Sequence, residues 1–223
     1  MEKIFKFLLI PVLAAPLVYL FIIWEKLPQS VALHFDLDGN PDRMGSRNDF
    51  IATIIIMSVV SLLTWLLMVN IHRIDPKRHV AENRGRMQRL GFGIVLFISM
   101  IACTIIYSAV KSSFTFSVSW VLAATGLLFS FIGNYMPNIK PNYFAGFRLP
   151  WTLENEDNWK KTHALVGRLW FPGGLLIALV CIFLPSRLAF YFFSTVMVII
   201  TLIPIIFSYR YYQQQKRSVN KDV

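Results

Sequence analysis

The sequence has little cysteine: only Cys103 and Cys181 occur among 223 residues. Two cysteines do not make a disulfide framework, and their spacing does not match a metal site. Both lie in apolar runs. A single bridge between these runs and two separate buried thiols are the alternatives, of which buried thiols are the simpler interpretation.

Acidic residues are also few, with 12 Asp and Glu against 22 Lys and Arg, so the net charge is +10. A basic chain is one mark of nucleic-acid binding, but the distribution of the charges indicates a membrane protein instead. Sixteen basic residues lie at the N-terminus, in residues 72–90 and 135–163, and after residue 209, whereas five lie in the alternate polar segments. The positive-inside rule then predicts that both termini are cytoplasmic. We expect some of these residues to meet anionic lipids, and we expect no direct nucleic-acid binding.

Charged residues are nearly absent from six apolar runs, at residues 5–24, 50–71, 91–110, 114–133, 164–184 and 188–209. A helix of about 20 residues, at about 1.5 Å per residue, crosses a hydrocarbon core of about 30 Å. The first run has no small-residue cleavage site after it, so we expect it to be a retained span rather than a signal peptide. The sequence predicts an all-α polytopic membrane protein with six transmembrane helices, one polar outer loop and one long inner loop.

The runs and loops divide the chain into four expected units. Residues 1–71 form an N-terminal unit with the outer loop 25–49, residues 72–90 a basic cytoplasmic loop, residues 91–209 a four-span unit with the central loop 134–163, and residues 210–223 a cytoplasmic tail. We expect the third and fourth runs to form a tight pair around a turn at residues 111–113. Gly91, Gly93 and Gly126 would allow the close approach of helices there.

The outer loop contains six candidate ligand-binding residues: His34, Asp36, Asp38, Gly39, Asp42 and Arg43. Their spacing is similar to that of a calcium loop, but glycine is the fourth residue from Asp36 rather than the sixth, and Arg47 replaces the required glutamate. No second histidine lies near His34 to complete a transition-metal site, so we expect no metal. Two interpretations remain open. The loop is an ordered cap with a short strand around residues 31–35, or it is a recognition surface for an extracellular ligand.

The long inner loop concentrates Pro, Asn, Gly and Trp, and loops of this length are usually functional. Its prolines exclude a regular helix, and we expect residues 149–151 to be extended or turned. Asn155 is the predicted N-cap of a helix that continues into the fifth run. Pro172 is expected to break that helix early.

The same loop contains titratable residues without a catalytic pattern. His163 and the acids Glu154, Glu156 and Asp157 match no metalloprotease motif, nucleophile elbow or phosphate loop. We therefore expect no enzyme, no cofactor and no metal. A structural plug at the membrane surface and a binding surface remain open, and the alternative function is a small-molecule transporter or membrane-embedded enzyme that uses this loop.

Two groups of short motifs resemble a known family. The first comprises Gly133-Asn134-Tyr135-Met136-Pro137, Lys140-Pro141-Asn142, Gly146-Phe147-Arg148, Pro150-Trp151-Thr152-Leu153, Asn158-Trp159 and Thr162-His163. It resembles the signature of the SdpI immunity-protein family. The second comprises Leu27-Pro28, His34-Phe35-Asp36, Gly39, Pro41-Asp42-Arg43 and Gly45-Ser46. It resembles the domain of unknown function with which members of that family often begin. Leu149 stands where threonine is expected, and Arg47 where lysine is usual.

This resemblance implies an immunity protein of the bacterial cell membrane, which protects the producing bacterium against a secreted antimicrobial peptide toxin. In the best-known member the toxin-bound protein also recruits a transcriptional repressor. The outer face would then meet the toxin and the basic inner face a cytoplasmic repressor. The signature residues, taken as a binding or structural site, are Asn134, Pro137, Lys140, Pro141, Asn142, Gly146, Arg148, Pro150, Trp151, Thr152, Asn158, Trp159, Thr162 and His163. We expect Arg148, Trp151, Asn158, Trp159 and His163 to act as one unit, and Trp65 and Trp120, in plain apolar runs, to matter less.

The charge distribution predicts the orientation of the chain. A cysteine introduced by Ser218→Cys should be protected from an impermeant thiol reagent added outside cells, and one introduced by Gln29→Cys should be labelled. The opposite labelling pattern would show that the termini lie outside.

Overall fold

The computed structural model describes residues 2–76, 80–110 and 117–219. Helices form most of these residues, and a short β-hairpin follows the first helix. The long helices are α1 (Glu2–Ile22), α2 (Arg47–Ile74), α3 (Val80–Val110), α4 (Val118–Tyr135), α6 (Glu156–Phe183) and α7 (Ser186–Val219). The short elements are the 3₁₀ turns η1 (Trp24–Lys26) and η2 (Met136–Asn138), the strands β1 (Ser30–Phe35) and β2 (Pro41–Ser46), and helix α5 (Pro150–Glu154).

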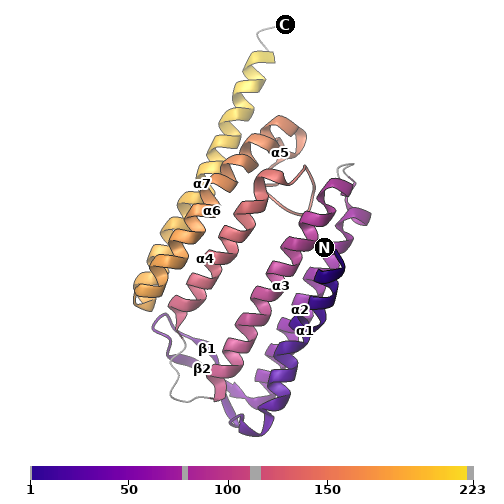
Figure 1. The fold of residues 1–223 in the computed structure, drawn as a ribbon. Coiled ribbons are helices and arrows are strands. Elements are labelled where there is room, and N and C mark those ends of the chain that lie inside the picture. The colour runs from indigo at the N-terminus through magenta and orange to yellow at the C-terminus, as the bar shows by residue number, and fades with distance from the viewer. Residues whose placement is uncertain (1, 77–79, 111–116, 220–223) are drawn as a thin grey trace.

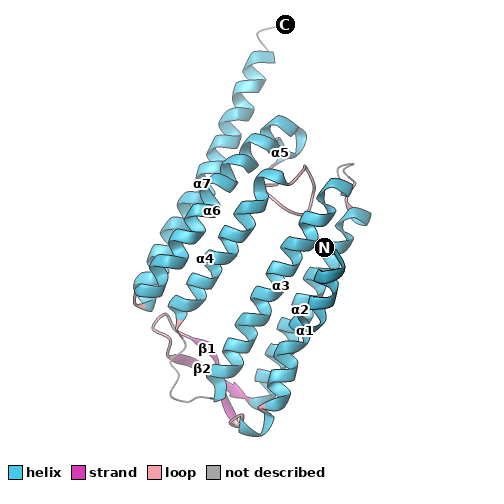
Figure 2. Ribbon diagram, in the orientation of Figure 1, coloured by secondary structure: helices cyan, strands magenta, loops and turns pink. Residues whose placement is uncertain are grey.

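The long helices form two groups, one of α1, α2 and α3 and the other of α4, α6 and α7 (Figure 1). The antiparallel hairpin β1–β2 lies at one end of the molecule, and the segment that carries η2 and α5 lies at the other (Figure 2). We call these the hairpin end and the loop end. The outer and inner loops expected from the sequence therefore lie at opposite ends of the same bundle.

The expected membrane class is confirmed. Among the described residues, five helices are long and apolar enough to cross a membrane by length and composition, namely Arg47–Ile74, Glu82–Val110, Val118–Asn138, Glu156–Phe183 and Ser186–Ser218. Within α1, Phe7–Ile22 is a shorter apolar helix. Large apolar side chains such as Phe7, Phe21 and Phe183 are about four-fifths exposed, as expected where lipid replaces water as the solvent.

The expected tight pairing of the third and fourth runs is wrong. Helix α4 packs most extensively against α6, whereas α3 packs mainly against α2 and α1. The turn predicted at residues 111–113 lies outside the described residues. Gly126 does allow a close approach, but toward α6: a Cβ at this position would lie 2.7 Å from the carbonyl oxygen of Gly174. Small residues at a membrane helix interface permit this backbone contact.

Prolines act differently from the expectation at two positions. Pro172 lies inside α6, which continues without interruption to Phe183. Pro150 begins the short helix α5, where its fixed φ suits the first helical position and its missing N–H costs nothing. Proline removes one intrahelical hydrogen bond, and α6 remains helical on both sides of Pro172 in spite of this loss.

The hairpin end has its own apolar core. The strand expected around residues 31–35 is confirmed, and it pairs with β2, which the sequence did not predict. Buried side chains of Leu27, Val31, Phe50 and Ile106 pack together there. Helix α2 begins at a capping box, in which Ser46 and Asp49 bond each other's backbone N–H groups. The hairpin is therefore fixed to α2 and α3 rather than loosely attached.

The glycine contact between α4 and α6 predicts a selective loss of stability. Gly126→Ala should lower the free energy of unfolding by about 1–3 kcal/mol, because the added methyl group meets backbone that cannot move aside. Gly85→Ala, in α3, is the matched control: its Cβ would meet nothing within 4 Å, and the loss of a helical glycine should be neutral or slightly stabilising. Thermal unfolding of the two purified variants in detergent measures the difference. Equal unfolding temperatures would contradict the close contact.

Candidate functional site

His163 lies at the centre of the loop end. It is fully buried in α6, and both ring nitrogens have backbone partners. Nδ1 is 2.9 Å from the carbonyl oxygen of Trp159, and Nε2 accepts the N–H of Phe147 at 3.0 Å. A ring that accepts at Nε2 and donates from Nδ1 is neutral. His163 therefore fixes the loop to the first turns of α6 as an uncharged group.

The rings around His163 explain why a glycine stands opposite it. Trp159 stacks on His163 with 3.9 Å between ring centroids, and the indole N–H donates to the carbonyl oxygen of Ile139 at 2.7 Å. Gly146 has φ of +114°, and a Cβ there would collide with the His163 ring. Glycine is thus required twice at this position, once by the backbone conformation and once by the space.

Asn142 organises the turn before Gly146. Its side-chain oxygen accepts the N–H groups of Phe144 and Ala145 at 2.9 and 2.7 Å, and its amide donates to the carbonyl oxygens of Lys140 and Ala145. The residue is 2% exposed. The Asn142 side chain thus bonds backbone groups two and three residues away. These bonds replace the regular backbone hydrogen bonds that a helix or strand would supply.

Two residues from the other helical group also bond this loop. Asn83 of α3 donates to the carbonyl oxygen of Lys140 and accepts its N–H, at 3.0 and 2.9 Å. Asp75, at the end of α2, accepts the N–H of Tyr143 at 3.1 Å. The sequence analysis missed both residues, because they stand alone in a basic stretch without a motif. Their only signal is an uncharged or acidic side chain within a stretch that is rich in basic residues.

Thr152 closes the loop onto α5. It is fully buried; its hydroxyl accepts the N–H of Leu149 at 3.0 Å and lies 2.6 Å from the carbonyl oxygen of Phe147. Asn155 caps α6 as expected, since its side chain accepts the N–H of Asn158 at 2.8 Å. The two short connections turn the chain from the loop into α6 within a few residues.

Helix α7 is held by the same segment through Ser208. The Trp151 indole donates to the hydroxyl of Ser208 at 3.0 Å, and the Asn158 amide donates to the carbonyl oxygen of Ser208 at 3.0 Å. The Thr162 hydroxyl in turn bonds the Asn158 side-chain oxygen. Asn158, Thr162 and Ser208 are fully buried. Ser208 was missed by the sequence analysis, because it lies inside the apolar run 188–209 and resembles an ordinary helix serine.

We call the buried set Asn142, Thr152, Asn158, Trp159, Thr162 and His163 the loop core. Six of the fourteen signature residues thus form it, with Gly146 in contact and Trp151 at its edge. Pro137 packs in the space left by Gly167 of α6, and Pro141 is buried. Asn134, Lys140 and Arg148 have exposed side chains. Arg148 bonds the carbonyl oxygen of Tyr143 at 2.7 Å, rather than groups near Pro150 or a glutamate.

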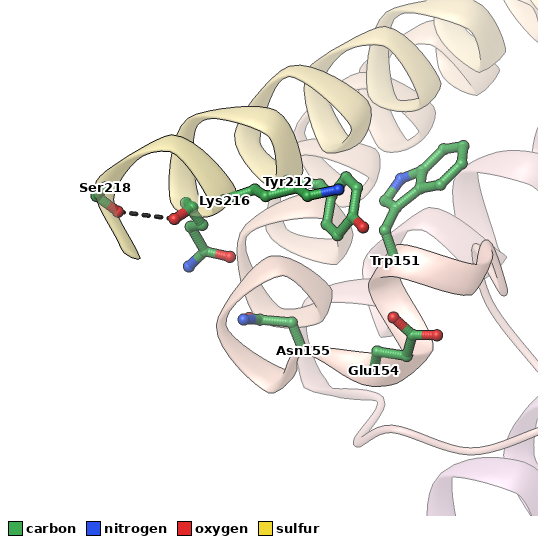
Figure 3. Close-up of a pocket in the computed structure, with 7 residues that line it drawn as sticks. Trp151, Glu154, Asn155, Tyr212, Lys216 and Ser218 are labelled. Atoms are coloured by element: carbon green, nitrogen blue, oxygen red, sulfur yellow. Dashed lines mark hydrogen bonds between the residues drawn. The ribbon is translucent and has the colours of Figure 1, made fainter. Parts of the chain in front are cut away.

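An open recess lies beside the loop core, between α5 and the C-terminal part of α7 (Figure 3). Trp151, Glu154, Tyr212 and Lys216 are among its lining residues, and its volume is about 520 Å³. The Trp151 ring also lies edge-on to Tyr209 at 5.2 Å. The recess is wide and carries one acid and one base, an arrangement that suits surface contact rather than catalysis.

At the hairpin end the six ligand candidates lie on the two strands and their turn. His34 pairs with Asp42 at 2.7 Å, and Arg43 stands opposite His34 in the register. Asp36 accepts the N–H groups of Asn40 and Asp38, and the backbone bond from Asn40 is the main reason that the pKa of Asp36 is lowered. The Asp36 carboxylate is therefore occupied by its own turn, in which Gly39 has φ of +86°.

Asp38 extends from the hairpin to the second helical group. Its carboxylate lies 2.7 Å from the guanidinium of Arg187, at the start of α7. Within residues 2–76, 80–110 and 117–219, no cluster of three or more His, Cys, Asp or Glu residues could hold a metal ion. The exposed polar side chains of this end are arranged as a surface rather than as a cavity.

The two hydrogen bonds between Asn83 and Lys140 join the two helical groups, and we expect their loss to lower the stability of the protein. Asn83→Ala should lower the free energy of unfolding by about 1–3 kcal/mol, since it removes two hydrogen bonds and leaves the backbone N–H of Lys140 without this partner, while the carbonyl oxygen of Lys140 keeps the bond from Asn142. Asn70→Ala is the matched control, because within the described part of the chain the Asn70 amide donates to the carbonyl oxygen of Leu66 in its own helix and to no other element. Thermal unfolding and protease resistance of the loop should both change more for Asn83→Ala than for Asn70→Ala. The reverse order would show that the Asn83 bond is incidental.

Comparison with known proteins bears on both ends. Residues 138–208 match the model of the SdpI/YfhL protein family, and residues 11–59 match a domain of unknown function, DUF1648. The first match contains the whole loop core and ends at Ser208, and the second contains the hairpin. No curated protein and no solved structure was found to match the chain. The resemblance inferred from the sequence motifs is thereby confirmed.

Proposed function

Because residues 138–208 belong to the SdpI/YfhL protein family, we propose that the chain is a membrane immunity protein that protects its bacterium against a secreted antimicrobial peptide. The single observation that carries the proposal is this family match, which covers the segment that forms the loop core. In the proposed orientation the hairpin end faces outward and the loop end faces the cytoplasm. The proposal assigns the chain no reaction and no cofactor.

The hairpin end supports a role in meeting the toxin. Its His34, Asp42 and Arg43 side chains are exposed on a sheet that is fixed to α2, so their positions are set before a ligand arrives. A preorganised surface loses less entropy on binding than a flexible loop does. The mixture of one histidine, acids and an arginine favours a peptide ligand, which offers both charges and backbone groups.

The loop end supports contact with a cytoplasmic partner. Lys140, Arg148, Lys160 and Lys161 are exposed around the buried loop core. Lys140 and Lys161 are paired with Glu82 and Asp157. Arg148 and Lys160 therefore supply the positive charge that attracts an acidic protein face and speeds its association. We propose that a cytoplasmic repressor protein binds here.

A survival experiment tests the protective function. A toxin-sensitive strain that expresses the chain should survive candidate peptides that kill the parent strain. Arg43→Gln should lower survival at unchanged protein level, because it alters the exposed sheet without touching the core. Arg73→Gln is the matched control, since Arg73 is exposed at the opposite end of α2. Failure to protect against any secreted peptide, or equal losses in the two variants, would overturn the proposal.

The same assay tests whether the loop core is needed for protection. Trp159→Ala should reduce membrane accumulation strongly, because loss of a large buried aromatic side chain costs about 3–5 kcal/mol. Trp120→Ala is a sound control, as Trp120 is 63% exposed. Trp65, expected to lie in a plain run, is unsuitable, because it is 5% exposed and packs with Leu9 and Val95. Normal accumulation and protection by Trp159→Ala would show that the loop core is a passive linker.

A further inference from the structure

Helix α7 has one face that remains exposed along its length and changes from apolar to basic. Ile199, Leu202, Ile203 and Ile206 are each between two-fifths and one-half exposed. Arg210 follows at the same helical spacing, and Arg217 lies two turns further along the same face. In a membrane-spanning helix an exposed apolar face meets lipid, so this geometry directs Arg210 toward the lipid side as well.

The opposite face of α7 explains why this exposure is fixed. Pro204 and Ser208 are buried, and Ser208 is held by Trp151 and Asn158. Further along the helix, Trp170 of α6 donates to the carbonyl oxygen of Ile200 at 3.2 Å. With these bonds on one side, α7 cannot rotate to bury Arg210 against the bundle.

Two recesses meet at Arg210. One, of about 330 Å³, is lined on the apolar side by Ile203, Ile206 and Phe207. The other, of about 570 Å³, is lined on the polar side by Gln213, Gln214 and Arg217. Arg210 contributes to both recesses. A ligand that fills both recesses must therefore be apolar at the end that lies toward the middle of α7 and polar at the end that lies toward the C-terminus.

The surface of α7 around Arg210 carries positive charge. Helix α7 contains no Asp or Glu over Ser186–Val219. Among the residues that the structure describes, no side chain pairs with the guanidinium of Arg210. The nearby acid Asp157 is used by Lys161 and Tyr211. The site thus offers an unpaired cation at the boundary between apolar and polar linings.

The depth of Arg210 fits a lipid headgroup. It follows Ile206 by four residues, or about 6 Å along the helix axis. The headgroup layer on each side of the hydrocarbon core is about 5–7 Å thick. Arg210 therefore lies within that layer when the exposed isoleucines lie in the hydrocarbon, and Tyr209 lies beside it as interfacial aromatic residues commonly do.

We propose that the face of α7 around Arg210 binds one anionic phospholipid, with the acyl and glycerol portion against Ile203, Ile206 and Phe207 and the phosphate on Arg210. Gln213, Gln214 and Arg217 meet the polar headgroup. An acidic protein partner would match the charge, but it would not fill the apolar recess that shares Arg210. The inference requires only that α7 spans the membrane, and it is independent of the proposed immunity function.

Lipid retention by the purified full chain tests this site. The protein is placed in nanodiscs of phosphatidylcholine with or without phosphatidylglycerol, and native mass spectrometry measures which lipid stays bound on delipidation. The wild-type chain should retain phosphatidylglycerol in preference to phosphatidylcholine. Arg210→Gln should weaken this retention about fivefold, which is equivalent to about 1 kcal/mol for one basic residue at the membrane surface. Because Arg210 is exposed, its loss should leave the unfolding temperature in pure phosphatidylcholine unchanged.

Lys216→Gln is the matched control. Lys216 is exposed in the same segment but lines the recess toward α5, together with Glu154. A defined site predicts that this variant retains phosphatidylglycerol as the wild type does. Equal weakening in both variants would show diffuse attraction to the membrane and would overturn the site. The absence of any preference for phosphatidylglycerol would also overturn the site. The same holds if the wild-type chain binds a poly-glutamate probe through Arg210 more tightly than it binds the lipid.

Discussion

The structure depends on how one irregular stretch of backbone satisfies its hydrogen bonds. Between the end of α4 and the start of α6 the chain has no ladder to pair its N–H and carbonyl groups, and an unpaired group in a buried site costs about as much as a lost hydrogen bond. Side chains supply the partners instead: Asn142 for the turn, Thr152 for the approach to α5, and His163 for Phe147. These residue types suit the role, since the side chains of asparagine, threonine and neutral histidine can each donate one hydrogen bond and accept another.

The same requirement links the two helical groups. At the loop end Asn83 and Asp75 reach from α3 and α2 to the backbone of the loop, and at the hairpin end Asp38 reaches to Arg187. The connections differ in strength. The exposed ion pair contributes little by itself, whereas loss of the Asn83 side chain removes two hydrogen bonds and leaves the N–H of Lys140 without its side-chain partner. The loop end is therefore the stronger of the two links, and the α4–α6 contact at Gly126 supports it from within its own group.

Much of this was predictable from sequence, and the failures have physical causes. Apolar runs and turn residues identified the membrane helices, the strand near Val31 and the N-cap at Asn155, because each rests on local pattern. The partner of α4 was not predictable, since a glycine shows that helices approach closely without showing which helix approaches. Pro172 was expected to interrupt α6, but the helix tolerates it. Asn83 and Ser208 carry no local signal, because their partners lie 57 and 50 residues away. The Trp65 environment was misjudged for the same reason.

The contact between Trp170 and the backbone near Pro204 predicts that these two positions vary together among homologues. Proline at 204 has no N–H for the carbonyl oxygen of Ile200, and the Trp170 indole occupies that oxygen instead. A chain with another residue at 204 would regain the intrahelical bond, and the tryptophan would then compete with it for the same acceptor. A chain that lost the tryptophan first would leave the carbonyl without a partner. The two positions are thus expected to change together across homologues, although they belong to different helices and lie far apart in sequence.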